Sequence, residues 1–449
     1  MGRLFGTDGV RGVANKELTP ELAFKLGKAG AYILKKENEK PIVIIGKDTR
    51  VSGDMLESAL TAGILAVGGN VIKVGVISTP AVAYLAKYYN ADAGIVISAS
   101  HNTFEYNGIK FFNGEGYKLD DLLEEKIEDI IISSVDVNSH ITGEKIGKCL
   151  EAEENALDLY VQHLLDTVDY RLDGMKIVLD CANGASYITA EKVYKALGAD
   201  VTVIGNEPNG ININDGCGST HPEKLAAKVK EIGADIGLAF DGDADRLIVV
   251  DETGAVIDGD RVIALCARML KKQGRLAQNK VTVTVMSNIG FHKAMKESDI
   301  EVDVTGVGDR YVLESMLETG CVIGGEQSGH IIFKEYTTTG DGVLSSLQFM
   351  KVLLDSDKKL SELAAEIEIF PQVLVNAKIN NDFKKTYMKV PEVAKAIEDM
   401  EAEMAGNGRV LIRPSGTEPL VRVMLEGDDI NKLDKLAHQL ADLIEEKCK

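Results

Sequence analysis

Short apolar runs rich in β-branched residues alternate with amphipathic stretches from the start of the chain to about residue 365. Examples of the apolar runs are residues 42–45, 93–97, 176–179, 236–240 and 281–285. Each run is too short for a buried helix and is closed by Gly, Asp, Asn or Ser, which is typical of a buried strand. The amphipathic stretches at 20–36 and 222–232 predict helices. This alternation predicts α/β units with parallel strands.

The organisation changes after about residue 370, where a Lys/Glu-rich amphipathic stretch precedes the segment 409–418. This part predicts a separate, smaller α+β domain at the end of the chain. A length of 449 residues is enough for about three domains, or four small ones.

The composition excludes several classes of partner. Seventy acidic side chains outnumber fifty basic ones and give a net charge of −20, whereas nucleic acids and anionic membranes select basic surfaces. No segment approaches the ~18 apolar residues of a membrane helix, and the first residues lack the apolar core of a signal peptide. The six cysteines are scattered without metal-like spacing. We therefore expect a soluble, intracellular protein.

Three aspartates at alternate positions, Asp241, Asp243 and Asp245, directly follow the run at 236–240. Their charges repel one another unless a cation compensates them, and hard divalent ions bind such oxygen clusters. An EF-hand loop is a poor match because Arg246 occupies the position of its glycine and the next residues predict a strand. An acidic, solvated turn is the alternative. The pattern favours a divalent metal site.

Ser100 lies in a dense polar loop, 98–102, that follows the run at 93–97. The Gly-x-Ser-x-Gly elbow of hydrolases is absent, because Ser98 and Asn102 stand at its glycine positions. A hydroxyl in this position, close in sequence to Lys110, could be a nucleophile or a phosphate carrier. A helix N-cap is the alternative function for this serine.

An arginine, two hydroxyls and a glycine lie together near the end of the chain, and a second arginine follows on the next apolar stretch. These residues are Arg413, Ser415, Gly416, Thr417 and Arg422. Guanidinium groups and exposed N–H groups bind phosphate oxygens, so the segment predicts an anion site, with a polar hairpin turn as the alternative. A Walker A loop is missing, which argues against NTP-driven kinase chemistry.

Two histidines, His101 and His330, belong to polar loops at strand ends. His330 is close in sequence to Glu326 and Ser328, so it could act as an acid or base while these neighbours bind hydroxyls. A divalent cation, a hydroxyl carrier, a hydroxyl-binding loop and a phosphate site together suit phosphoryl transfer on a phosphosugar.

With these motifs in this order, the chain resembles the α-D-phosphohexomutase superfamily, and within it the bacterial phosphoglucosamine mutases. The motifs that carry the resemblance cover essentially the whole chain: residues 7–12, 98–102, 241–246, 305–310, 325–330 and 413–419. Gln327 and the stretch at 215–220 resemble the aminosugar branch. Thr103 departs from the pattern, because many relatives have Pro there.

The resemblance implies three consecutive α/β domains with mixed, largely parallel sheets and a C-terminal α+β domain, heart-shaped around a central cleft. It implies a phosphoserine-loop domain at 1–153, a metal-binding domain at 154–253, a sugar-binding domain at 254–369 and a phosphate-binding domain at 370–449.

The resemblance also implies the roles of the site residues. Ser100 would carry a phosphoryl group, and one Mg²⁺ would be held by this phosphoserine with Asp241, Asp243 and Asp245. The transferring phosphoryl group would be surrounded by Arg11, His101, Lys110 and Arg246, with Lys110 or His330 as general acid or base. Glu326 and Ser328 would bind sugar hydroxyls. The phosphate that is not reacting would be held by Arg413, Ser415, Gly416, Thr417 and Arg422.

The reaction that the resemblance implies is the interconversion of glucosamine 6-phosphate and glucosamine 1-phosphate through the 1,6-bisphosphate. This step feeds UDP-N-acetylglucosamine and cell-wall synthesis. The expected partner is a small phosphosugar in the cytoplasm, with no nucleic acid and no membrane, and a homodimer is the assembly to be tested.

Three alternatives stay open at this point. The first is a phosphomannomutase/phosphoglucomutase of the same superfamily. The second is a haloacid-dehalogenase-like phosphatase with Asp241 as nucleophile, although Asp245 replaces the Thr expected there. The third is a non-catalytic regulator that binds a phosphosugar.

Overall fold

The computed structural model describes residues 4–6, 8–35, 40–384, 386–404, 408–415 and 419–448. The chain forms two compact units. Residues 1–286 and 299–365 make up the first unit, and residues 287–298 and 366–449 make up the second. The first unit contains three β-sheets and the second contains one.

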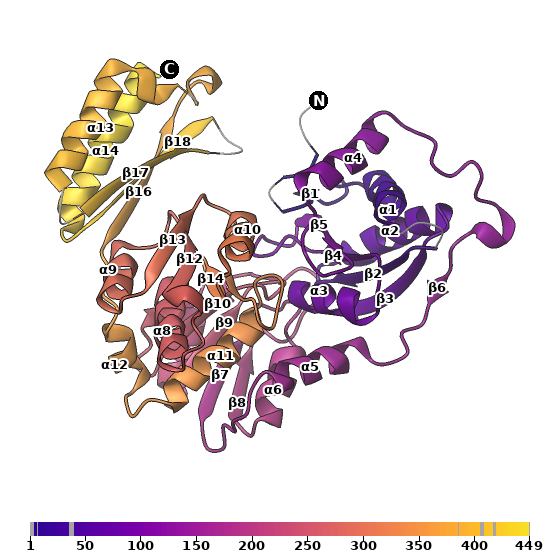
Figure 1. Cartoon of the computed structure of the whole chain (residues 1–449), viewed down its shortest axis with the longest axis horizontal. Coiled ribbons are helices and arrows are strands. Elements are labelled where there is room, and N and C mark those ends of the chain that lie inside the picture. Colours follow the sequence, from indigo (N-terminus) through magenta and orange to yellow (C-terminus); the bar gives the residue numbers. More distant parts are fainter. Residues whose placement is uncertain are drawn as a thin grey trace. The chain divides into compact units, whose positions relative to one another are not determined.

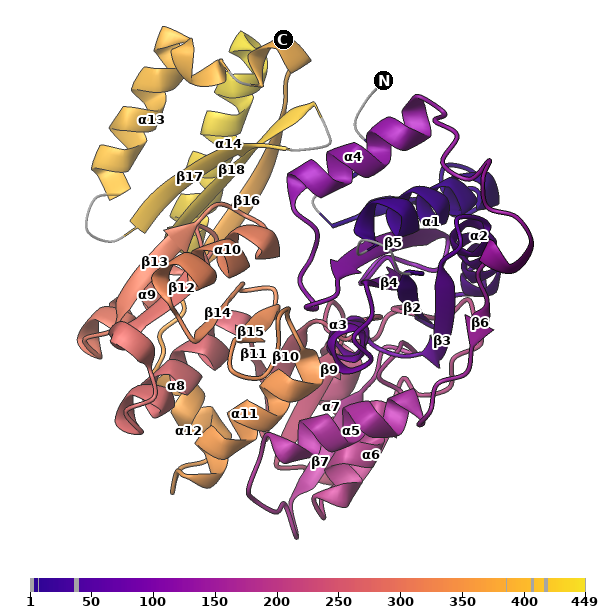
Figure 2. The same ribbon diagram turned by 45° about the vertical axis from the view of Figure 1, so that its right-hand side comes forward.

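The first sheet has six strands in the order β1-β5-β4-β2-β3-β6. The strands are β1 (Val10–Val13), β2 (Ile42–Lys47), β3 (Asn70–Val76), β4 (Ala93–Ile97), β5 (Tyr106–Asn113) and β6 (Cys149–Leu150). β2 pairs in parallel with β3 and β4, and β5 runs antiparallel to β4 and β1. Helices α1 (Pro20–Leu34), α2 (Gly53–Ala66) and α4 (Asp121–Ile132) lie on one face and α3 (Thr79–Tyr88) on the other (Figure 1, Figure 2).

The second sheet has five strands in the order β11-β10-β9-β7-β8. The strands are β7 (Lys176–Asp180), β8 (Asp200–Ile204), β9 (Ile236–Phe240), β10 (Leu247–Asp251) and β11 (Val256–Ile257), accompanied by α5 (Ala156–Asp166), α6 (Thr189–Ala196) and α7 (Glu223–Ile232). β9 is parallel to β7 and antiparallel to β10. The aspartate motif therefore joins two strands rather than two helices, which excludes an EF-hand.

The third sheet has four strands in the order β13-β12-β14-β15. The strands are β12 (Lys280–Thr284), β13 (Glu301–Thr305), β14 (Ile323–Gly325) and β15 (Ile331–Phe333), and the helices are α8 (Gly259–Lys272), α10 (Asp309–Thr319), α11 (Gly342–Leu354) and α12 (Leu360–Ala365). β12 pairs in parallel with β13 and β14, and β15 runs antiparallel to β14. Short 3₁₀ turns of the chain lie at Gly143–Lys145, Ala277–Asn279, Asn381–Phe383 and Tyr387–Lys389.

The second unit is built on an antiparallel sheet of three strands in the order β16-β18-β17. It comprises β16 (Gln372–Lys378), β17 (Gly408–Pro414), β18 (Leu420–Gly427), α9 (Ile289–Glu297), α13 (Pro391–Met404) and α14 (Ile430–Lys447). Apolar side chains of α13 and α14 form its core with the inward residues of the strands. Asn288 Oδ1 accepts a hydrogen bond from the Phe370 amide at 3.0 Å, which ties α9 to this unit.

The predicted fold class is confirmed: three α/β sheets of mixed direction are followed by an α+β domain. The predicted strands match β2, β4, β7, β9 and β12 to within a residue or two. The first predicted helix ends at Leu34, two residues early. The four domain boundaries stay a prediction. Among the described residues, no helix has the length and apolar character needed to cross a bilayer.

Candidate active site

Ser100 lies in the loop that follows β4, and its hydroxyl is buried against the second sheet. Ser100 Oγ donates a hydrogen bond to Asp241 Oδ2 at 2.6 Å. The backbone of Ser100 has a φ of 52°, in the left-handed region that side chains other than glycine rarely adopt. The turn continues into β5 and begins no helix, so the N-cap alternative is wrong. The loop holds a serine hydroxyl against the carboxylate cluster.

Arg50 holds the backbone of this serine loop in place through hydrogen bonds to its carbonyl groups. Its Nη2 donates to the carbonyl oxygens of Ser100 at 2.9 Å and Asn102 at 2.8 Å, and its Nη1 donates to the carbonyl of Thr103. Asp48 accepts from Arg50 Nε at 2.8 Å, and both side chains are fully buried. The departure from Pro at position 103 therefore does not leave the loop unsupported, because Arg50 binds its carbonyl groups directly.

Asn214, from the second sheet's side of the unit, reinforces the same loop. Its Nδ2 donates to the carbonyl oxygens of Ser100 at 2.8 Å and Asn102 at 2.9 Å. Gly242 approaches from that side as well, and a Cβ at this position would lie 2.6 Å from the Ser100 carbonyl oxygen. The serine loop and the aspartate loop thus meet backbone to backbone.

The three aspartates occupy the turn between β9 and β10, and each is buried. One carboxylate oxygen from each lies within 4.8 Å of those of the other two. Burial, together with the charges of Asp245 and Asp243, raises the pKa of Asp241 well above its ordinary value. Oδ1 of Asp243 and Oδ1 of Asp245 are buried without a hydrogen-bond partner in the described part of the chain. Hard, mutually repelling oxygen atoms without donors fit a divalent cation such as Mg²⁺.

Lys110, on β5, reaches the same cluster from the first sheet. Its Nζ lies 2.7 Å from Asp243 Oδ2 and 2.9 Å from Asp8 Oδ2, and the side chain is almost completely buried. Burial disfavours the ammonium ion, but the charges of Asp243 and Asp8 outweigh it and raise the pKa of Lys110. The pKa of Asp243 is correspondingly lowered, because Lys110 outweighs the opposing effect of burial. Lys110 is therefore a cation.

Other predicted cationic and imidazole groups surround Ser100. Arg11, on β1, pairs with Asp8, and the amide of Arg246 donates to Asp241 Oδ1 at 3.2 Å. Nδ1 of His101 lies 3.4 Å from Ser100 Oγ. Burial and the charges of Arg246 and Arg11 lower the pKa of His101 to about 4, so its ring is neutral at neutral pH.

The loop between β14 and β15 brings the third sheet's residues to this site. Glu326 Oε1 accepts from the amide of Gly308 at 3.2 Å, and Ser328 Oγ donates to Glu326 Oε2 at 3.4 Å. His330 is buried, with Nε2 3.3 Å from Asp309 Oδ2. The backbones of Arg246 and His330 form an isolated β-bridge, which joins this loop to the aspartate loop.

The predicted phosphate-binding residues belong to the second unit. Arg413 on β17 and Arg422 on β18 are direct cross-strand partners, and the Ser415 amide donates to the Leu420 carbonyl at 2.9 Å. Two neighbouring guanidinium groups suit a phosphate site, because they can bind phosphate oxygens. Gly416 and Thr417 lie outside the described residues.

The structure thus brings together the predicted residues of the first unit, and it adds residues that the sequence analysis did not select. These are Asp8, Asp48, Arg50, Thr79, Lys118, Asn214 and Asp309. Asp48 and Arg50 directly follow β2, so the rule that pointed to Ser100 applied to them too. Lys118 and Asn214 carry no such signal in the sequence.

Four family models match consecutive parts of the chain, and all four describe phosphoglucomutase/phosphomannomutase domains. Alpha/beta/alpha domain I matches residues 2–136, domain II residues 158–254, domain III residues 258–370 and the C-terminal domain residues 374–443. The chain therefore contains domains I, II and III and the C-terminal domain of this class of enzymes.

Curated relatives and solved structures agree with this assignment. The phosphoglucosamine mutases of Clostridium kluyveri and Clostridium botulinum (strain Loch Maree) are each 57% identical to the chain, with full coverage of both sequences. A phosphoglucomutase/phosphomannomutase family protein from Burkholderia thailandensis has the same fold, with a TM-score of 0.81 at 24% identity, covering 100% of this chain and 98% of its own. The N-acetylphosphoglucosamine mutase of Aspergillus fumigatus, solved with GlcNAc-6P and magnesium, has a TM-score of 0.72 at 16% identity, covering 99% and 96%.

The domains and the loops that meet at Ser100 define a phosphohexomutase, an isomerase that acts as an intramolecular phosphotransferase. Within this class, the chain belongs to the phosphoglucosamine mutase family. The relatives do not favour the phosphomannomutase/phosphoglucomutase alternative. Membership of a mutase family also disfavours the phosphatase and the non-catalytic regulator.

Proposed function

We propose that this protein interconverts glucosamine 6-phosphate and glucosamine 1-phosphate, with Ser100 as the phosphoryl carrier and glucosamine 1,6-bisphosphate as the intermediate. One observation carries the proposal: Ser100 Oγ lies 2.6 Å from an oxygen of Asp241, beside the cluster of three buried carboxylates. A phosphoryl group on this oxygen would stand next to a carboxylate cluster suited to a divalent cation.

Two transfers make up the reaction. In the first, the hydroxyl oxygen at C1 of glucosamine 6-phosphate bonds to phosphorus while the bond from phosphorus to Ser100 Oγ breaks. The hydroxyl proton passes to a general base, and a general acid protonates Ser100 Oγ. In the second, Ser100 Oγ attacks the 6-phosphoryl group of the bisphosphate, whose O6 takes the returning proton. The serine is phosphorylated again and glucosamine 1-phosphate leaves.

Proton transfer falls to Lys110 and His330. Asp243 and Asp8 hold Lys110 in its charged form, so it can stabilise developing negative charge and give its proton only to a strongly basic oxygen, such as the departing Ser100 Oγ. His330 is then the candidate general base, oriented by Asp309. Arg11, His101 and Arg246 would surround the phosphoryl group, and Arg11 and Arg246 would neutralise its equatorial oxygens.

Asp241, Asp243 and Asp245 would hold Mg²⁺ together with the phosphoserine. Bound Mg²⁺ would supply charge neutralisation at the phosphoryl oxygens. Glu326 and Ser328 would bind sugar hydroxyls, and a carboxylate also offers an acceptor for the ammonium group of an aminosugar. Arg413, Ser415, Gly416, Thr417 and Arg422 would hold the phosphate that is not reacting.

The proposal includes the setting of the enzyme. We infer a cytoplasmic protein with a phosphosugar as its partner and without nucleic acid or membrane, and a homodimer is the assembly to test by sedimentation. The net charge of −20 supports the exclusion of polyanions. The six cysteines, none of which forms a disulfide, support a reducing compartment. The boundaries at 1–153, 154–253, 254–369 and 370–449 remain our proposal for the domains.

Intact-mass measurement on the purified protein tests the carrier. We expect the mass of one phosphate on the wild-type chain, its absence from Ser100→Ala, and its presence in the exposed control Ser139→Ala. Ser100→Ala should also abolish turnover of glucosamine 6-phosphate. Activity that survives this substitution would sink the proposal, and a faster reaction with glucose or mannose phosphates would reject its substrate.

A further inference from the structure

Lys118 forms an ion bridge that joins the first and third sheets of the first unit. Lys118 comes after β5 in the sequence. Its Nζ lies 2.7 Å from Asp8 Oδ1 and also pairs with Asp309 Oδ2. The Lys118 side chain is only 11% exposed. Asp8 precedes β1, whereas Asp309 begins α10. One ammonium group thus connects carboxylates that are 301 residues apart in the sequence (309 − 8).

Each end of this bridge touches a group that we propose for proton transfer. Asp8 Oδ2 lies 2.9 Å from Nζ of Lys110, and Asp309 Oδ2 lies 3.3 Å from Nε2 of His330. The result is a continuous series of polar contacts from Lys110 through Asp8, Lys118 and Asp309 to His330, in which the first four side chains alternate in charge. Lys110 and His330 belong to different sheets, so their relative position depends on the ion pairs of Lys118 that lie between them.

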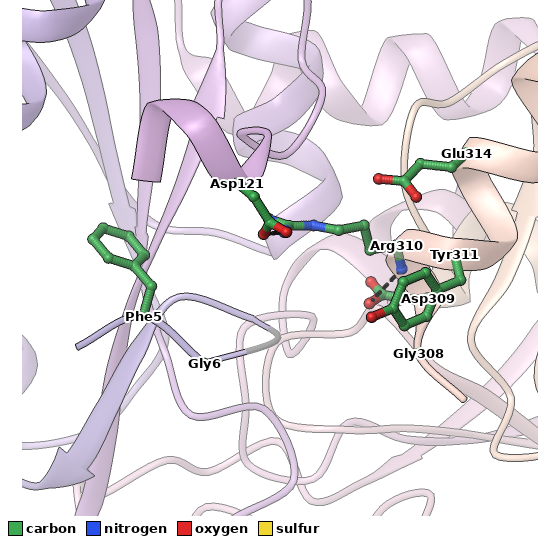
Figure 3. Close-up of a pocket in the computed structure, with 8 residues that line it drawn as sticks. All are labelled: Phe5, Gly6, Asp121, Gly308, Asp309, Arg310, Tyr311 and Glu314. Carbon is green, nitrogen blue, oxygen red and sulfur yellow. Dashed lines mark hydrogen bonds and ion pairs between the residues drawn. The ribbon is translucent and has the colours of Figure 1, made fainter. Parts of the chain in front are cut away.

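Further polar contacts hold the same two segments together. Arg310 Nη2 donates to the Leu119 carbonyl at 2.5 Å and pairs with Glu124 Oε1 at 2.9 Å, while Nη1 pairs with Asp121 (Figure 3). Thr338 Oγ1 donates to the Gly116 carbonyl at 2.5 Å. The segment from Leu119 to Glu124 therefore docks onto the first turn of α10, and Gly116 contacts the loop that follows β15.

Apolar packing covers only part of this junction, where Tyr117 packs against a small cluster that includes Val312 and Met316 of α10. A cavity of about 310 Å³ opens beside it, lined in part by Phe5, Gly6, Tyr311 and Glu314 (Figure 3). Because apolar packing does not fill this cavity, ion pairs and hydrogen bonds add restraint to the relative position of the two sides. Their directionality suits this task, since each contact has a preferred geometry.

Lys118 is the central cation in this series of contacts. Burial acts against its ammonium form, but the charges of Asp309 and Asp8 outweigh this effect and raise the pKa of Lys118. Without Lys118, Asp8 would keep Lys110 and Arg11 as partners. The Asp309 carboxylate would lose a close cation and keep His330, at 3.3 Å. We therefore expect the side chains of Asp309 and His330 to move more than those of Asp8 and Lys110.

We propose that Lys118 is a positioning residue for the mutase reaction, which sets Lys110 and His330 at their working separation by bridging Asp8 and Asp309. This inference rests on the proposed function and assigns Lys118 no contact with the substrate. Misplacement by about 1 Å at such a site can cost about 100-fold in rate.

Steady-state kinetics with glucosamine 6-phosphate and Mg²⁺ test the proposal. Lys118→Met removes the charge and keeps most of the chain length. We expect kcat to fall about 10- to 100-fold while KM changes less than about threefold, since the sugar-binding groups stay in place. Lys118→Arg should recover part of kcat, because it restores the cation. Phosphate on Ser100, measured by intact mass, should match that of the wild type.

Lys47→Met is the matched control. Lys47 is the last residue of β2 and also bridges two carboxylates, with Nζ 2.6 Å from Asp54 and 2.9 Å from Glu57, and its side chain is 14% exposed. It belongs to the first sheet, and its ammonium group pairs with carboxylates of α2 rather than with a carboxylate of the active site. We expect Lys47→Met to lower the melting temperature about as much as Lys118→Met does, while its kcat stays within about twofold of the wild type.

A double substitution separates positioning from general damage. Asp309→Asn should lower kcat on its own, and Lys118→Met with Asp309→Asn should lose clearly less than the product of the two single effects, because both act through one contact. Independent effects, or a kcat for Lys118→Met equal to that of Lys47→Met, would overturn the inference while the wild-type activity upholds the proposed function. A wild-type protein without turnover would instead reject the proposed function, and this inference with it.

Discussion

Arg50 and Ser100 are joined by a hydrogen bond in which Nη2 of the arginine donates to the serine carbonyl oxygen at 2.9 Å. The same guanidinium also binds the carbonyls of Asn102 and Thr103 and is anchored by Asp48. The left-handed backbone at Ser100, with φ at 52°, costs roughly 1–2 kcal/mol, and these contacts offset that cost. A buried side chain thus determines where the carrier hydroxyl stands.

Arg50→Lys is therefore expected to impair phosphoryl transfer although it conserves the charge. A lysine offers one donor centre and cannot bind three carbonyls and Asp48 in one plane. We expect kcat to fall about 10- to 100-fold and the melting temperature to drop by a few degrees. Arg171→Lys is the control, because Arg171 also pairs with an aspartate two residues away but is 62% exposed. An active Arg50→Lys enzyme would refute the role of the clamp.

Asp245→Asn is expected to weaken Mg²⁺ binding. Asp245 Oδ1 is buried without a hydrogen-bond partner in the described chain, so a neutral amide would replace a ligand oxygen or present N–H groups to the cation. We expect at least a tenfold rise in the Mg²⁺ dissociation constant, or about 1.4 kcal/mol. Calorimetric titration after EDTA treatment measures it, with the exposed Asp235→Asn as control. Equal affinities would place the metal elsewhere.

Asp341→Asn is expected to change how stability depends on pH. Burial raises the pKa of Asp341 from its ordinary value of 3.8 to about 6 in the folded protein. Between these values the folded state binds more protons than the unfolded state, so the unfolding free energy falls as pH rises from about 4 through about 6. Above about pH 6 the stabilisation that the protonated Asp341 contributes is completely lost.

The asparagine variant should lack this decline because it does not titrate. Its amide can still accept from the Leu344 N–H and can donate to the Tyr160 hydroxyl, which are two of the present contacts of the Asp341 side chain. We expect it to gain about 1–3 kcal/mol on the wild type between pH ~4 and pH ~7 in urea titrations. The exposed N-cap variant Asp120→Asn should show no such gain. Parallel curves for Asp341→Asn and wild type would contradict the assignment.

Gly340→Ala is expected to displace the imidazole of His330. A Cβ at position 340 would lie 2.4 Å from His330 Nε2, and the buried ring has little room to move away. We expect a loss of about 1–3 kcal/mol in stability from overpacking and a decrease in kcat, with the phosphate on Ser100 retained. Gly53→Ala, where the Cβ would meet the flexible Lys47 side chain at 3.3 Å, is the control. An unchanged kcat would argue against His330 as an acid or base.

The strands and the polar residues at their ends could be predicted from the sequence because both signals are local. The turn at Asp241 follows a buried strand, and β10 begins just after it, so the hairpin could be predicted from neighbouring residues alone. Asp48 and Arg50 gave the same signal after β2 and were overlooked, because a single Asp–Arg pair also suits an ordinary surface turn.

Other features had no local signal. The bridge of Lys118 to Asp8 and Asp309 depends on how two sheets pack, and the surrounding residues of Lys118 show no pattern that separates it from a solvated lysine. Likewise, the alternation of strands and helices favours a helix between β12 and β13. It does not indicate that α9 packs with the last strands of the chain, because the partner of an amphipathic face is a tertiary property.

The close approach of Gly242 to the Ser100 carbonyl has a consequence for building hybrid enzymes. Since no side chain lies between the two backbones, no substitution can compensate for a small misfit there. A chimaera that takes the serine loop from one relative and the aspartate loop from another would inherit any difference in backbone position in full. These two loops should therefore be exchanged together, as a single cassette with Asn214, whereas residues exposed far from the contact can be mixed freely.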